Sequence, residues 1–368
     1  MSKVYGKSQY KIGLFHKNGS AFGTDATTSN TYKLLPVINV SSPVLNLIES
    51  GEIRSNNPGM VETDFDQFRT RKGGFVTLDF EVPAERGFLT RMVANVLQDH
   101  EETGSSPNFI HTVKVADNGS GVGRLARPDF DASSTDGIPS LFDVALYGAA
   151  SGEDKLMTNA VLQSLTMNFD MTDGRLLLNG TFYSGFANSG FKVGQTVAAA
   201  PSLVSTSPTQ IESYFDTKQL DVADVATDVV ITAVSFTIEN NIARVGRAAD
   251  GDAENYAFGI PSVNITGEIS FMYDDNFNDG AANVIQDFLD GDTATLTLKQ
   301  TTDGTVDTAG EMSIIAEIYS TAVNYDLNAD TGAIITVPFK VVQPTVDGEP
   351  NGTAFEFKHV DGISNSSW

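Results

Sequence analysis

The chain of 368 residues contains no cysteine. This absence excludes disulfide scaffolds, zinc sites with thiolate ligands, iron–sulfur clusters and cysteine nucleophiles. It leaves the redox compartment of the protein undetermined. Tryptophan and histidine are also scarce, with one tryptophan, Trp368, and four histidines. A site built on histidine therefore has to draw its members from widely separated parts of the sequence.

Positive charge is scarce as well, since 23 Lys and Arg stand against 47 Asp and Glu, which gives a formal net charge of −24. General binding of nucleic acid needs rows of basic side chains on phosphates, so this charge disfavours it. The sequence has no apolar run of the length that spans a membrane. Residues 1–20 lack the apolar core of a secretory signal. We therefore expect a soluble protein made in the cytoplasm.

Glycine and phenylalanine are abundant, with 33 and 23 residues, and together with Thr and Val they favour strands and tight turns. Residues 75–82 (FVTLDFEV) alternate apolar and polar side chains, which is typical of a half-buried strand. Residues 165–178 are predicted to form a hairpin that turns at residues 172–174. A second hairpin is predicted for residues 314–342, with its turn at residues 328–332. These patterns predict a mainly β fold.

Two segments depart from the β pattern. Between Glu85 and His100, apolar residues recur at helical spacing and form one stripe. Residues 281–289 show the same spacing. We predict a short helix in each segment, and each follows a predicted strand.

The two halves of the chain share three short blocks in the same order. Residues 48–50 with Arg54 match residues 238–240 with Arg244. The blocks at 94–99 and 282–287 match within the predicted helices, and those at 168–171 and 324–327 match within the predicted hairpins. Three ordered matches indicate a duplicated module. The alternative is that two unrelated β domains share common dipeptides.

The repeat predicts a division of the chain into five parts. Residues 1–33 hold five lysines and one aspartate, so this end is expected either to lie as an arm on an acidic surface or to be a solvated terminus. The predicted parts are a basic arm at 1–35, a first module at 36–186 with an insertion near 116–150, a linker at 187–228, a second module at 229–345 and a tail at 346–368.

Motifs for catalysis or for cofactor and metal binding are incomplete. Gly6-Lys7-Ser8 lacks the first glycine of a phosphate-binding loop, and Arg124 replaces the third glycine of a dinucleotide fingerprint at residues 119–124. We expect no enzyme activity, no catalytic or cofactor-binding residue, no cofactor and no metal. A polar surface position is predicted for each of the histidines, His16, His100, His111 and His359.

Several segments together resemble the tail tube (major tail) proteins of long-tailed bacteriophages. They are residues 48–54 (IESGEIR), the Gly73-Gly74 step into residues 75–82, the hairpin at 164–186, and residues 233–244 and 259–275 of the second half. The resemblance covers roughly residues 37–342. The basic arm, the insertion and the tail depart from it.

The resemblance implies two tandem β-sandwich modules, each with one short helix. Their inner sheets would form a barrel in an assembled ring, and stacked rings would form a virion conduit for DNA ejection without specific DNA binding. Two modules per chain permit a homotrimeric ring of pseudo-sixfold symmetry in place of a hexamer. Other tail proteins are implied partners, and no membrane is involved.

The candidate acids of such a bore are Asp79, Glu81 and Glu268, because each alternates with apolar neighbours along its strand. An acidic wall would repel phosphates. The alternation does not separate a face toward a lumen from an outer face. Alternative functions are a terminator, a tube protein of a contractile injection system, or an acidic surface adhesin.

Overall fold

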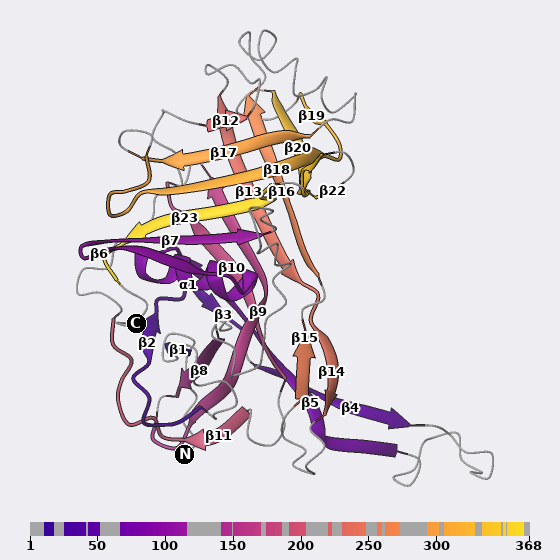
Figure 1. Ribbon diagram of the computed structural model, residues 1–368. Coiled ribbons are helices and arrows are strands. Elements are labelled where there is room, and N and C mark those ends of the chain that lie inside the picture. The colour runs from indigo at the N-terminus through magenta and orange to yellow at the C-terminus, as the bar shows by residue number, and fades with distance from the viewer. Residues whose placement is uncertain are drawn as a thin grey trace, which may run out of the picture.

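The computed structural model describes residues 11–17, 26–41, 43–51, 67–115, 141–148, 150–170, 174–185, 191–203, 220–222, 230–247, 256–259, 262–272, 293–301, 305–327, 333–346, 349–350 and 352–363. Within these residues the protein is mainly β, as predicted, and Figure 1 shows long antiparallel strands around one helix. In the described part of the chain, all paired strands are antiparallel, and one isolated parallel bridge joins Lys33 and Ser202.

The central sheet runs through both halves of the chain. β3 and β4 lie end to end along β5 at one edge, and β19 lies at the other edge. The sheet is open within the described residues. Its strands, in order of pairing, are β3 (Asn39–Val40) with β4 (Val44–Gly51), β5 (Gln67–Pro83), β10 (Leu177–Gly185), β9 (Asp154–Asp170), β13 (Ile231–Asn240), β16 (Val263–Met272), β20 (Ile334–Val341) and β19 (Asn324–Asp326).

A second layer crosses the central sheet steeply, as the strands β17, β18, β23 and β7 show in Figure 1. It joins the central sheet where the end of β18 pairs with β20. Such crossing of two layers buries one face of each sheet in a shared core. Its strands, in order of pairing, are β12 (Leu220–Val222), β17 (Ala294–Gln300), β18 (Met312–Ser320), β23 (Phe355–Asp361), β7 (Asn108–Val115) and β6 (Glu101–Ser105).

A smaller sheet is built on the first part of β9, which is long enough to serve two sheets. Two pairs of short strands complete the described β structure: β14 (Ala243–Arg247) with β15 (Tyr256–Gly259), and β21 (Thr345–Val346) with β22 (Glu349–Pro350). The smaller sheet has the order β2 (Lys33–Leu35), β1 (Lys11–Lys17), β8 (Leu141–Tyr147), β9 and β11 (Phe191–Gln195).

The helix predicted between residues 85 and 100 is confirmed as α1 (Arg86–Leu97). It is buried from Gly87 to Leu97, more fully than a single apolar stripe requires, because β7, β9, β13 and β23 all contact it. It ends at Gln98, whose φ of 55° lies in the left-handed region that stops a helix. The second predicted helix, residues 281–289, lies outside the described residues.

Both predicted hairpins are confirmed. β9 and β10 pair across the turn that contains Gly174, whose φ is +70°. β18 and β19 together pair with β20, and the turn at residues 328–332 lies outside the described residues.

Separate tandem sandwiches are not confirmed, because the two halves share both layers. β9 of the first half pairs with β13 of the second. β23, within the segment predicted as a tail, pairs with β18 on one side and β7 on the other. Its residues Phe355 and Phe357 are fully buried.

The basic arm, the insertion within the first module and the linker are predicted as distinct segments, but strands from all three lie in the smaller sheet. β1 from the arm pairs with β8 from the insertion, and β11 from the linker pairs with β9. Residues 11–17 are therefore not a solvated terminus. Lys17 on β1 forms a buried ion pair with Asp143 on β8, at 2.9 Å.

Candidate functional site

The candidate functional surface is the face of the central sheet that points away from the core. We call it the polar face. On β5, Val76, Leu78 and Phe80 are buried, whereas Asp79 is exposed and Glu81 is half-buried. Because side chains alternate across a strand, the odd-numbered residues of this stretch share one face. The predicted alternation of residues 75–82 is thus confirmed.

Strand register extends this alternation across six strands. Directly opposed residues of an antiparallel pair lie on the same face, so each row of partners crosses the sheet on one side. One row is Glu81, Asn179, Thr166, Thr237, Thr266 and Lys340. A neighbouring row is Asp79, Thr181, Ser164, Glu239 and Asn264.

Hydroxyl groups hydrogen-bond across the strands of the polar face. Thr166 and Thr237 are joined through their hydroxyl oxygens at 3.0 Å, and Ser270 and Thr336 at the same distance. These bonds satisfy the hydroxyl groups within the sheet and hold its strands in register. The polar face is therefore hydrophilic, and its hydroxyl side chains are held in place by hydrogen bonds.

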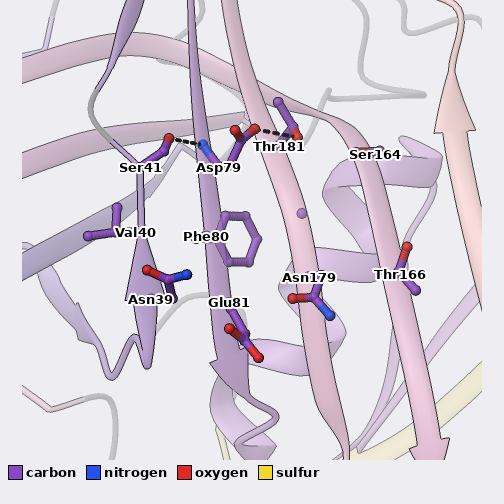
Figure 2. Close-up of a pocket in the computed structure, with 11 residues that line it drawn as sticks. Asn39, Val40, Ser41, Asp79, Phe80, Glu81, Ser164, Thr166, Asn179 and Thr181 are labelled. Carbon is purple, nitrogen blue, oxygen red and sulfur yellow. Dashed lines mark hydrogen bonds between the residues drawn. The ribbon is translucent and has the colours of Figure 1, made fainter.

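An open hollow of about 570 Å³ lies at the β3 end of this face (Figure 2). Thr181 donates a hydrogen bond to Asp79 Oδ1 at 2.8 Å, and the backbone amide of Asp79 donates to Ser41 Oγ at 3.0 Å. Asp79 lines the hollow and is exposed, and the bond from Thr181 orients its carboxylate. Serine, threonine, asparagine and acidic side chains supply most of the lining.

Charge on the polar face is strongly one-sided where side chains are described. Among the side chains that the structure describes on this face, the one base is Lys340 on β20. A phosphate approaching this face meets carboxylates over most of its width, and like charges repel over a Debye length of about 8 Å at physiological salt. The acids are Asp79, Glu81, Asp170, Glu239, Glu268 and Asp326.

The structure places all three acids predicted for a bore, Asp79, Glu81 and Glu268, on this one face. Asp170, Glu239 and Asp326 lie on the same face and were not among the predicted acids. The alternation of residues 231–240 (ITAVSFTIEN) carried the signal for Glu239, because it separates Val234, Phe236 and Ile238 from the polar positions.

The prediction that each histidine occupies a polar surface position is wrong. His111 and His359 are fully buried, and neither His16 nor His100 is exposed. His111 Nε2 lies 2.9 Å from Asp361 Oδ1, and His111 Nδ1 lies 3.0 Å from His100 Nε2. The strand pairing of β7 with β23 brings these distant residues together.

The same cluster ties α1 to the last strand of the fold. Arg91 forms a buried ion pair with Asp361 and donates a hydrogen bond to the carbonyl of Ile363 at 2.8 Å. Thr90, one residue earlier on α1, lies 2.8 Å from His359 Nδ1. Arg91, His111 and Asp361 therefore form one buried polar network between α1, β7 and β23.

Burial keeps most of these histidines neutral. It lowers the pKa of His16 to about 3, with help from the Arg91 charge, and lowers the pKa of His100 to about 4. It likewise lowers the pKa of His359 to about 3. Burial opposes the charged form of Asp361, but the hydrogen bond from His111 and the Arg91 charge outweigh it and hold the pKa of Asp361 below its usual value.

Among the described residues, no group of three or more histidine and acidic side chains is arranged to hold a metal ion. No helix in the described part of the chain has the length and apolar character needed to cross a bilayer. No protein-family model matches the chain, and no curated protein matches it.

Proposed function

We propose that this chain is a structural subunit of a phage tail tube, in which copies join into rings and stacked rings form a conduit for DNA. The observation that carries the proposal is the polar face of the central sheet. It is continuous over both halves of the chain, rich in acids, and backed on its other side by the hydrophobic core.

The charge of this face suits a conduit for a polyanion. A bore that binds DNA would slow its passage, whereas an acidic wall keeps phosphates off the surface. Asp79, Glu81 and Glu268 supply part of that wall. The hydroxyl and amide side chains between them carry no net charge, so they add no Coulombic attraction for the DNA backbone.

The open sheet supports assembly. In the described residues, β3 pairs only with β5 and β19 only with β20. Unpaired edges recruit other strands, and a ring removes them by pairing each edge with a neighbouring copy. One continuous sheet with two such edges is therefore well suited to be a segment of a barrel.

The test is electron microscopy and native mass measurement of the purified protein. Stacked tubes with a central bore support the proposal, and three copies of the 39.3 kDa chain give a ring of about 118 kDa. Single rings that never stack would favour a terminator. A protein that stays monomeric at every concentration tested would overturn the proposal.

A further inference from the structure

Each half of the central sheet contains a four-stranded unit with one pairing order. The first unit consists of β3, β5, β9 and β10. Across the sheet these strands lie in the order β3, β5, β10, β9, so the last two strands of the chain order are exchanged. The second unit consists of β13, β16, β19 and β20. They lie in the corresponding order β13, β16, β20, β19. The third strand of the first unit, β9, pairs with the first strand of the second, β13. This pairing is a junction between units inside one chain.

A shared glycine–phenylalanine pair aligns the two units residue by residue. Phe80 lies opposite Gly180 between the second and fourth strands of the first unit. Gly267 lies opposite Phe339 at the same place in the second unit, with the two residue types exchanged. Phe80 therefore corresponds to Gly267, and Gly180 to Phe339.

This alignment shows which residues of β3 correspond to which residues of β13, the first strands of the two units. Val40 lies opposite Phe80, and Phe236 lies opposite Gly267, so Val40 corresponds to Phe236. Two residues earlier on each strand, Ile38 corresponds to Val234. This relationship differs from the sequence match of residues 48–50 with 238–240, which the pairing of the strands does not reproduce.

The third strands align in the same way. Asn168 lies opposite Leu177, which precedes Gly180 by three residues, and Asn324 lies opposite Thr336, which precedes Phe339 by three. Asn168 thus corresponds to Asn324. On the next position, Phe169 corresponds to Tyr325, as in the sequence repeat.

The two residues that meet at the internal junction are buried, and their counterparts at the free edges are not. Phe169 lies opposite Val234, and both are fully buried. Their counterparts, Tyr325 on β19 and Ile38 next to β3, are 53% and 50% exposed. Large apolar side chains are thus left half-exposed at both ends of the sheet, at the positions that a junction covers within the chain.

We infer that copies of this chain join head to tail by repeating the internal junction, with β19 of one copy antiparallel to β3 of the next and Tyr325 opposite Ile38. The interface is heterologous, so it closes into a ring when the rotation per copy permits. Strand addition at two open edges buries the unpaired backbone groups of both. This inference rests on the proposed function and specifies how its rings are joined.

The absence of native cysteine makes cross-linking a direct test. Ile38→Cys and Tyr325→Cys chains are prepared separately, mixed under assembly conditions and oxidised mildly. A disulfide requires Cβ atoms about 4 Å apart, so the junction predicts a mixed dimer on a non-reducing gel. The matched control mixes Tyr325→Cys with Val193→Cys, because Val193 on β11 is also an exposed apolar residue, at 61%. We expect at least a tenfold higher yield from the first mixture.

Charge substitution provides the second measurement. Ile38→Lys and Tyr325→Lys place a charge at each predicted junction position, and both should leave a folded monomer whose assembly is lost. Val193→Lys should assemble as the unaltered protein does. Circular dichroism and a melting curve confirm folding in each case.

The outcomes separate this inference from the proposed function. Rings that form without preferential cross-linking, or that survive both lysine substitutions, overturn the Tyr325–Ile38 junction and leave the tube function standing. A protein that remains monomeric, with no cross-link above the control, overturns both.

Discussion

Phe80 on β5 covers Gly180 on the neighbouring strand β10, and a Cβ atom added at Gly180 would lie 2.6 Å from the Phe80 ring. Phe339 covers Gly267 in the same way, with a Cβ–ring distance of 2.4 Å. The glycines provide the space that the aromatic rings fill in the core of the central sheet. The described residues thus show this arrangement in both halves of the chain.

Alanine at either glycine should therefore destabilise the protein. We expect Gly180→Ala and Gly267→Ala each to lower the free energy of unfolding by about 1–3 kcal/mol, because the added methyl group overpacks the core. At Gly267 it would also lie 2.1 Å from the backbone oxygen of Ser235. Urea unfolding measures the change. Gly362→Ala is the control, since its nearest neighbour would be at an ordinary 3.5 Å. Equal effects at all three positions would contradict the packing argument.

Asn240 should be important for the attachment of α1. Its side-chain amide donates hydrogen bonds of 2.7 Å to the carbonyls of Val96 and Leu162, and it is buried. Asn240→Ala leaves both carbonyls without this donor and should cost about 1–3 kcal/mol. Its neighbour Asn241 is exposed, so Asn241→Ala should change stability by less than about 0.5 kcal/mol. Thermal unfolding of the two variants makes the comparison, and similar melting temperatures would refute the prediction.

The ion pair of Lys17 and Asp143 should anchor β1 to β8. Lys17→Met leaves a buried carboxylate without its cation and should cost about 3–5 kcal/mol. Lys17→Met combined with Asp143→Asn removes both charges and should recover much of that loss. Chemical denaturation of the single and double variants measures the difference. A double variant no more stable than the single one would show that the uncompensated charge is not the cause.

The buried histidines should make the fold sensitive to acid. The pKa values of His16, His100 and His359 lie near 3 to 4 in the folded protein, against about 6.5 in an unfolded chain. Between these values the unfolded state binds more protons, so stability is full above pH 6.5 and falls as the pH drops. Below pH 6.5, and down to its folded pKa, each of these histidines lowers the free energy of unfolding by about 1.4 kcal/mol per pH unit.

Urea unfolding from pH 7.5 to pH 4.5 measures this slope. His359→Gln removes one of the three histidines and should make the decline shallower. An unfolding free energy that stays constant over this pH range would contradict the predicted linkage.

Replacing acids of the polar face with lysine should make this face bind DNA instead of repelling it. Asp79→Lys, Glu81→Lys and Glu268→Lys should leave assembly intact but slow DNA release. DNA retention by assembled tubes at about 50 mM and 200 mM salt provides the measurement, because phosphate contacts weaken with salt. Glu101→Lys is the control, since Glu101 is an exposed acid on β6, away from this face. Equal retention by all variants would count against the conduit.

Local sequence patterns predicted the strand at residues 75–82 with its buried face, both hairpins and α1. Such features depend on residues a few positions apart, as in the alternation that separates Leu78 and Phe80 from Asp79. Alternation also identified Asp79, Glu81 and Glu268 as polar positions of their own strands, but the pairing of β5, β10, β9, β13 and β16 is what brings the three acids onto one face.

Only the tertiary structure decided which distant segments meet. His111 and Asp361 come together because β7 pairs with β23, and Lys17 meets Asp143 because β1 pairs with β8. No periodicity within either strand specifies its partner, since pairing depends on the shape and packing of the whole core. For the same reason the sequence alone predicted two separate modules, whereas the folded chain joins both halves through β9 and β13.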